Sequence, residues 1–230
     1  MENKKEKKTR TGAQVFQESA MKNRLILSIG TKGSGKTFLM LKFLKHCFDR
    51  KLYKRYVLVL PAFKFEQNDS YSFIDPKDPD VFVFDGYHEN ISSQLMTIQK
   101  KGKGRMKTLF ILDDASGENI WKLDPSLQRL ITVIRHLDIT LWLIVHAATG
   151  VLSPFLRAQC DILLLSKMTN HKLLESIWEE YLSITSKYKG REGHRSWIDD
   201  FIQLMDEPFK VIFIDMRNGL IDTDADKWSW

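Results

Sequence analysis

The chain has 230 residues, of which 43% are hydrophobic and 28% are charged, and this suits a single domain with one sizeable core. Its two cysteines, Cys47 and Cys160, lie in separate apolar contexts and exclude a disulfide framework or a cysteine metal site. The N-terminus is a run of lysines with no apolar stretch behind it, which argues against a signal peptide and favours an intracellular protein.

The formal net charge of +6 is unevenly distributed along the chain. Residues 1–12 carry +3, residues 100–107 carry +5 and residues 187–195 carry +3, so the rest of the chain carries −5. Three basic segments on an acidic body favour contact with a polyanion. Solvated loops and a frayed tail would give the same pattern.

Apolar runs rich in Val, Ile, Leu and Phe alternate with helical segments along the chain. This alternation predicts an α/β fold with a mostly parallel sheet and helices on both faces. The predicted strands are residues 25–29, 56–60, 81–84, 108–112, 140–145, 162–165 and 209–215. The predicted helices are residues 36–48, 92–101, 125–136, 171–187 and 196–205.

The predicted domain organisation is one domain with appendages. Residues 1–20 are expected to form a basic arm, residues 21–222 one domain with an exposed loop at 187–195, and residues 223–230 an aromatic tail. The stretch 139–156 carries no charged residue, but its second half contains Gly, Ser and Pro. We therefore expect a buried strand and a loop there, and no membrane span.

The first motif with a chemical meaning is the segment GTKGSGKT, which matches G-x-x-x-x-G-K-[ST] in full between a predicted strand and a predicted helix. In such a loop, successive backbone N–H groups surround the β-phosphate, the lysine reaches the β- and γ-phosphates, and the last hydroxyl ligates Mg²⁺. The sequence therefore predicts a P-loop that binds ATP with Mg²⁺. Its residues are Gly30, Thr31, Lys32, Gly33, Ser34, Gly35, Lys36 and Thr37.

Polar side chains follow two later predicted strands, those at residues 108–112 and 140–145. Asp113 and Asp114 end the strand predicted at 108–112. Asp113 is the expected metal partner of Thr37, and Asp114 is placed to orient or deprotonate the attacking water. His146 ends the following strand and would contact the γ-phosphate or the water if that strand lies between the P-loop strand and the Asp113 strand. A core histidine bonded to backbone is the alternative.

The order of these elements resembles the genome-packaging ATPases of double-stranded DNA viruses with double-jelly-roll capsids. These are the poxvirus-type enzymes and their relatives within the FtsK and HerA superfamily of DNA pumps. The similarity covers roughly residues 22–166. It is carried by the P-loop, the Asp113-Asp114 strand end, a helix ending in Arg135-His136, the strand ending in His146, and the segment from Leu152 to Arg157 before the next strand.

The resemblance implies a RecA-like core and a homo-oligomeric ring, a pentamer or a hexamer, in which neighbouring subunits share each nucleotide. An arginine from one subunit would stabilise the γ-phosphate held by the next. Arg157 matches the family's arginine position best, and Arg135 is second. The sequence departs from the superfamily at Asp114, where cellular members usually carry Glu, and at His146, where an amide is common.

The implied function is ATP-driven translocation of double-stranded DNA into a preformed capsid, inside the host cell or at the packaging vertex of the virion. Its partners would be DNA and capsid vertex proteins. A motor that must pass any sequence should contact phosphates and not bases. The predicted contacts, which precede the Asp113 strand and so lie at its end opposite the nucleotide, are Lys100, Lys101, Lys103, Arg105 and Lys107.

Other readings remain open from the sequence alone. The N-terminal arm and the loop at 187–195 compete as DNA or capsid contacts, and the aromatic tail would either dock on a neighbouring subunit or pack on its own domain. A small-molecule kinase would need several lid arginines, but the region after His146 offers mainly Arg157. A nucleotide switch would not need the second acid, Asp114, and a cellular pump would need room for an anchor or accessory domain.

Overall fold

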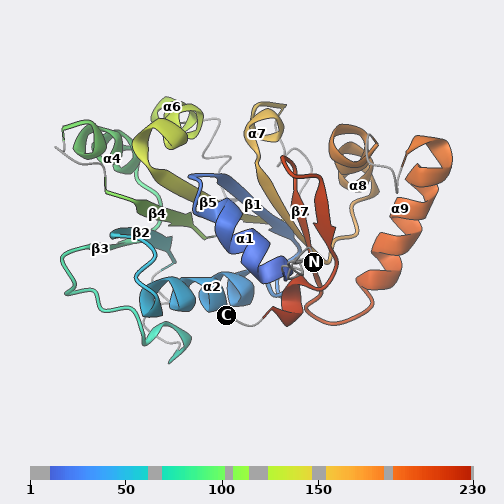
Figure 1. Ribbon diagram of the computed structural model, residues 1–230, viewed down its shortest axis with the longest axis horizontal. Helices are drawn as coiled ribbons and strands as arrows, with labels where there is room; N and C mark the ends of the chain where they lie inside the picture. Colours follow the sequence, from blue (N-terminus) through green and yellow to red (C-terminus); the bar gives the residue numbers. More distant parts are fainter. Residues whose placement is uncertain are drawn as a thin grey trace, which may run out of the picture.

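The computed structural model describes residues 11–61, 69–101, 106–113, 124–146, 154–183 and 189–228, with the side chain of Arg157 left out. These residues form one sheet with helices packed on it (Figure 1). The strands are β1 (Leu25–Gly30), β2 (Arg55–Leu60), β3 (Val81–Asp85), β4 (Thr108–Leu112), β5 (Ile139–His146), β6 (Ile162–Ser166), β7 (Val211–Asp215) and β8 (Leu220–Asp222).

The α-helices are α1 (Gly12–Ala20), α2 (Lys36–Asp49), α4 (Asn90–Lys101), α6 (Pro125–Val133), α7 (Pro154–Gln159), α8 (His171–Ile177) and α9 (Gly190–Leu204). Shorter helical turns are η1 (Asp69–Tyr71), η2 (Ile134–Leu137), η3 (Trp178–Leu182) and η4 (Ala225–Lys227). No helix in the described ranges is long and apolar enough to cross a membrane.

The strand order explains how the site is assembled. Across the sheet the order is β3-β2-β4-β5-β1-β6-β7-β8. The strands from β3 to β6 run parallel, and β7 and β8 are antiparallel additions at one side. β1 lies between β5 and β6, and β5 separates it from β4. The predicted α/β fold with a mostly parallel sheet is confirmed, and β5 occupies the place that the interpretation of His146 required.

Each face of the sheet has its own hydrophobic core, because side chains alternate between the two faces along every strand. Leu27 of β1 packs on one face with residues of α4, α6, α8 and α9, while Ile26 packs on the other with α1 and α2. Figure 1 shows the same division, with α4, α6, α7 and α8 on one side of the strands and α1 and α2 on the other. The central strands are buried on both faces, which accounts for their continuous apolar runs.

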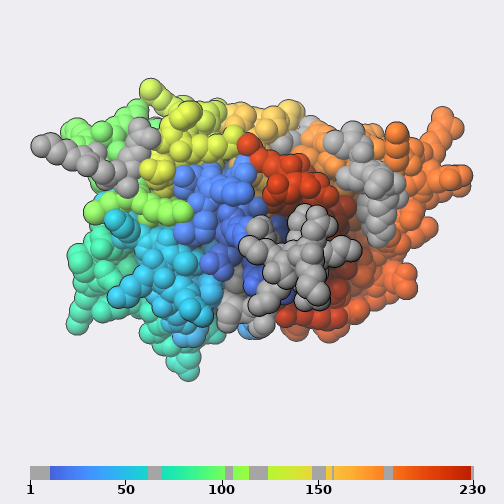
Figure 2. All heavy atoms as spheres, in the orientation of Figure 1, coloured from blue at the N-terminus to red at the C-terminus, as the bar shows by residue number. Residues whose placement is uncertain are grey.

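The prediction that residues 1–20 form an arm is wrong for the residues that the structure describes. Helix α1 begins with a capping box, in which Thr11 Oγ1 accepts from the Gln14 N–H at 3.3 Å and Gln14 Oε1 accepts from the Thr11 N–H at 3.1 Å. Phe16 of this helix is 1% exposed. Figure 2 shows α1, in blue, against the red C-terminal part of the chain. Residues 1–10 lie outside the described residues.

At Trp228 the C-terminal segment follows the second of the two predicted alternatives, packing on its own domain. Trp228 is buried and packs on Phe16 and Phe213, and its indole Nε1 donates to Asp222 at 3.0 Å. Trp228 therefore packs on its own domain, whereas Trp230 lies outside the described residues. β8 was not predicted, because its three residues are too short for a strand signal.

The predicted exposed loop at 187–195 is replaced, from Gly190 onward, by the start of α9. Buried Trp197 and Phe201 hold this helix on the core. The basic residues at its start, Lys189, Arg191 and Arg195, are exposed. Residues 187 and 188 lie outside the described residues.

Candidate nucleotide site

The P-loop follows β1 directly, and glycine is required at three of its positions. Gly33 and Gly35 have φ values of +76° and +92°, which an L side chain rarely adopts. Gly30 is limited by space, because an added Cβ would lie 2.7 Å from both the Ser166 Cβ and the Ser34 Oγ. The loop is also fixed to the segment after β6, since the Thr31 N–H and hydroxyl donate to the Lys167 carbonyl at 2.8 and 3.0 Å.

Lys36 lies in the middle of this loop. Its Nζ donates to the carbonyls of Gly30 at 2.9 Å and Thr31 at 2.7 Å, and the residue is 6% exposed. The carbonyl oxygens hold the Lys36 ammonium beside the backbone N–H groups of the loop. The arrangement concentrates positive potential where an anion would bind.

Thr37 and Asp113 bring the loop and β4 together. The Thr37 Oγ1 lies 3.4 and 3.3 Å from the two carboxylate oxygens of Asp113, which is buried and follows β4. Among the described residues, no group of three or more His, Cys, Asp or Glu could hold a metal ion. Mg²⁺ is usually held by one or two carboxylates together with phosphate oxygens and water, so the hydroxyl and carboxylate pair suits Mg²⁺ that arrives with a triphosphate.

Tyr71 lies close to this pair, and sequence reasoning missed it. The residue ends η1, between β2 and β3, and is 2% exposed. Burial and the nearby Asp113 carboxylate raise the pKa of Tyr71 well above its usual value. Its phenol therefore keeps its proton throughout the neutral range and stays able to donate a hydrogen bond.

His146 ends β5 directly beside the start of the loop. It is the register partner of Gly30 in the parallel β1–β5 pair, and it is half-buried. Because β5 lies between β1 and β4, His146 borders the same cavity as Lys36 and Asp113. Asp114, the predicted second acid, lies outside the described residues.

A cavity of about 420 Å³ opens over the loop. The P-loop forms its floor, and Asp113 and His146 border it on the β4 and β5 side. Its lining also includes two phenylalanines that the sequence did not single out, Phe38 and Phe209. Phe38 directly follows Thr37, but the sequence does not indicate whether a phenylalanine at this position is exposed or buried in the core.

The structure gives one of the two arginine candidates a partner. The Arg135 guanidinium donates to Asp161 Oδ1 at 2.6 Å, and Arg24 and Arg217 donate to the same oxygen. Asp161 precedes β6, so this cluster lies at the edge of the sheet opposite the P-loop. Arg157 lies in α7, and its side chain is not among the described parts of the structure.

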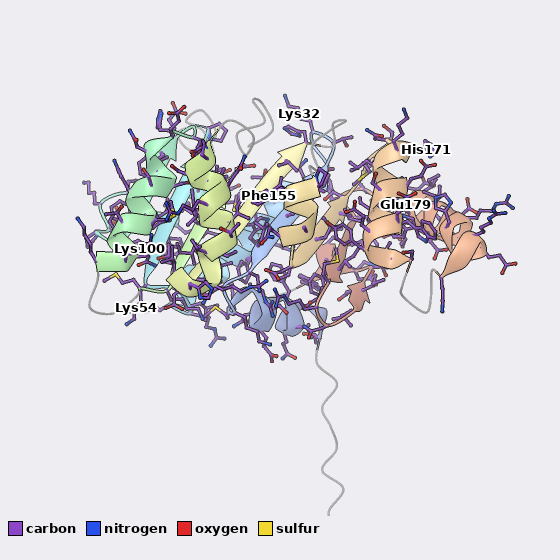
Figure 3. The ribbon with its side chains drawn as sticks, turned by 90° about the horizontal axis from the view of Figure 1, so that it is seen from above. Lys32, Lys54, Lys100, Phe155, His171 and Glu179 are labelled. Atoms are coloured by element: carbon purple, nitrogen blue, oxygen red, sulfur yellow. The ribbon has the colours of Figure 1, made fainter. Side chains whose placement is uncertain are left out.

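The structure describes three of the five predicted nucleic-acid contacts, Lys100, Lys101 and Lys107. Lys100 and Lys101 end α4 and are exposed. Lys107 is half-buried, and burial lowers its pKa. Figure 3 shows Lys100 toward the edge of the sheet opposite Lys32 of the P-loop. Lys103 and Arg105 lie outside the described residues.

Comparison with solved structures shows where this fold occurs. The chain is similar to the DNA-packaging ATPase B204 from Sulfolobus turreted icosahedral virus, with a TM-score of 0.62 and 14% identity over 87% of this chain and 96% of that one. It is also similar to the genome-packaging NTPase B204 from Sulfolobus turreted icosahedral virus 2 in complex with ATPγS, with a TM-score of 0.58 and 17% identity over 88% and 97% of the two chains.

A more distant similarity is to the KaiC-like protein PH0186 from Pyrococcus horikoshii OT3, with a TM-score of 0.51 and 12% identity over 87% of this chain and 82% of that one. At these identities the solved structures establish the fold. No curated protein matches the sequence. The family model of the poxvirus A32 protein matches residues 15–154, which is more than half of the chain. The chain therefore belongs to the poxvirus A32 protein family, as its resemblance to the poxvirus-type enzymes predicted.

Proposed function

We propose that the chain is an ATP-driven double-stranded DNA translocase that packages a viral genome into a preformed capsid. One observation carries the proposal: the P-loop, with Lys36 at its centre, shares a cavity with the Thr37–Asp113 pair and with His146. This set of groups can bind a triphosphate, hold its metal and contact the γ-phosphate from the neighbouring strand. Family membership and the similarity to packaging NTPases, one of them in complex with ATPγS, support the same activity.

Each residue has a distinct role in the proposed hydrolysis. Lys36 would hold the β- and γ-phosphates, and Thr37 and Asp113 would hold Mg²⁺. Asp114 orients or deprotonates the attacking water, and His146 contacts the γ-phosphate or that water. Bound Mg²⁺ would supply the electrostatic stabilisation, while the protein fixes the position of the reacting groups.

The described half of the site offers no arginine at the cavity, which fits a finger supplied by the neighbouring subunit of a ring. Arg157 is the proposed finger. Arg135 is less suited, because Asp161, which is almost fully buried, already binds its guanidinium. Withdrawing Arg135 would leave that carboxylate with fewer partners, and such changes are costly in a buried site.

The proposed DNA contact includes the exposed end of α4, at Lys100 and Lys101. This end lies on the edge of the sheet away from the P-loop (Figure 3). ATP hydrolysis could move DNA at that edge only if a structural change passed from the P-loop across the sheet, or if the subunits rotated. The exposed basic start of α9 remains a second candidate contact.

Double-stranded DNA is expected to raise the ATPase rate of the wild-type chain, and the stimulation should fall steeply as salt rises. Each phosphate contact contributes about one to the slope of log affinity against log salt. A Lys100→Ala, Lys101→Ala double variant should therefore lower that slope by up to about two, with an unchanged basal rate. The measurement is steady-state phosphate release over a salt series, with DNA affinity measured in parallel.

Lys172→Ala is the matched control, because Lys172 is an exposed lysine at the start of α8, far from α4 in the sequence. It should leave both the DNA response and the slope as they are in the wild type. ATP turnover that ignores DNA in an assembled oligomer would contradict the proposal and favour a kinase or a nucleotide switch.

A further inference from the structure

Two exposed aromatic side chains border the nucleotide cavity, and the binding of phosphate groups does not explain their presence. Phe38 is 61% exposed and Phe209 is 62% exposed. Scattered exposed apolar residues are ordinary, but these two flank one cavity whose floor is the P-loop. Phosphates bind N–H groups and cations, so two apolar rings at this place indicate an apolar part of the same ligand.

Phe209 is held in its position by the surrounding turn. Its φ of +61° is rare for a bulky residue and costs free energy. The next residue, Lys210, is buried and forms ion pairs with Glu207 at 3.1 Å and Asp224 at 2.9 Å. The chain therefore turns inward at Lys210 while the ring of Phe209 stays outside, which presents its surface to the solvent at the cavity.

Contact with the P-loop depends on a glycine. A Cβ added to Gly35 would lie 3.2 Å from the Phe209 Cβ and 3.4 Å from its Cδ1. A side chain at position 35 would push the ring back by a few tenths of an ångström, so the glycine lets the ring approach the loop this closely. Phe209 thus borders the site at the residue directly before Lys36.

The strand order places the two ends of a bound nucleotide. Asp113 and His146, which mark the metal and the γ-phosphate, follow β4 and β5 on one side of β1. Phe209 precedes β7, on the other side of β1 and beyond β6. A triphosphate whose γ-phosphate points toward β4 must direct its nucleoside away from β4, which is toward Phe209.

We infer that Phe209, with Phe38 beside it, forms the platform on which the base of a bound nucleoside triphosphate stacks. The inference rests on the proposed triphosphate site and adds its base subsite. Phe209 is the principal partner, because the Lys42 ammonium lies 5.0 Å from the centre of the Phe38 ring and covers part of it. Since every base has a π face, the platform binds purines with little discrimination between adenine and guanine.

The test compares ATP with inorganic tripolyphosphate, which has the phosphates and lacks the base. Calorimetric titration with Mg²⁺ would use the full-length wild type and Phe209→Gly, a variant that removes the ring and relieves the positive φ. Stacking on an aromatic side chain strengthens binding by about fivefold to 150-fold. Phe209→Gly should weaken ATP binding by such a factor and leave tripolyphosphate binding within about twofold, and Phe209→Trp should restore ATP binding.

Phe82→Ala is the control, because Phe82 is a 41% exposed phenylalanine on the edge strand β3 and does not border the cavity. It should bind both ligands as the wild type does. Equal affinity of the wild type and Phe209→Gly for ATP, or an equal loss for ATP and tripolyphosphate, would overturn the platform and leave the triphosphate site intact. A wild type that binds neither ligand would instead overturn the proposed function and the platform with it.

Discussion

Replacing Lys36 with alanine is expected to abolish ATP hydrolysis, with a loss in turnover of about 100-fold or more. The Lys36 ammonium is the one charge at the centre of the P-loop among the described residues, where it donates to the Gly30 and Thr31 carbonyls. No neighbouring side chain of the loop can replace it, because Lys32 is exposed at the cavity rim. The measurement is steady-state phosphate release at saturating ATP with Mg²⁺.

Two further measurements make this result interpretable. A thermal melt separates lost chemistry from lost folding, since removing a lysine that bonds two loop carbonyls also affects stability by about 1 kcal/mol per bond. Lys45→Ala is the matched variant on the same helix, where Lys45 forms an exposed ion pair with Asp49 and lies 5.6 Å from the centre of the Phe73 ring, away from the nucleotide cavity. It should leave turnover unchanged. A folded Lys36→Ala protein with wild-type turnover would show that hydrolysis occurs elsewhere.

Phe16→Ala is expected to lower the free energy of unfolding by about 3–5 kcal/mol. The Phe16 ring is 1% exposed and lies 5.0 Å from the ring of Phe43, 5.6 Å from Trp142, 5.7 Å from Phe213 and 5.3 Å from Trp228. Truncation leaves a cavity where α1, α2, the sheet and the C-terminal segment meet, and these rings cannot all move to fill it. Urea unfolding followed by circular dichroism measures the loss.

Glu18→Ala on the exposed face of the same helix is the control, and it should change stability by no more than about 0.5 kcal/mol. The comparison distinguishes a helix that belongs to the core from an appended arm. If Phe16→Ala were as mild as Glu18→Ala, α1 would not be part of the cooperative unit.

The sequence predicted the site where one short segment carries the chemistry. GTKGSGKT identifies the P-loop because all of its groups lie within eight positions, and Asp113 is marked by the buried strand before it. The place of His146 followed only once β5 was known to lie between β1 and β4. That order depends on long-range strand pairing, which no local pattern encodes.

The residues that were missed come together from distant parts of the chain. Tyr71 lies near enough to Asp113 for the carboxylate to raise the pKa of its phenol, Lys167 holds Thr31 from the end of β6, and Phe209 meets Gly35 from the turn before β7. None of them belongs to a motif. Their roles depend on the parallel strands ending at one edge of the sheet, where loops far apart in sequence meet.

Helix α1 is a different case, because its signal was present in the sequence. Thr11 and Gln14 have the spacing of a capping box, and Ala13, Phe16 and Ala20 recur at helical spacing. The basic arm predicted for residues 1–20 rested on the lysine run that precedes residue 11. Charge composition describes the residues that carry it and gives little information about the apolar stripe that follows.

In the proposed function, a neighbouring subunit completes each catalytic site. The most direct test is the native mass of the full-length protein with a non-hydrolysable ATP analogue, Mg²⁺ and double-stranded DNA. The expected particle is a closed ring of about five or six copies on one duplex, because a shared site requires every subunit to have a neighbour. A monomer that binds the analogue tightly and hydrolyses ATP at a rate per subunit independent of protein concentration would contradict it.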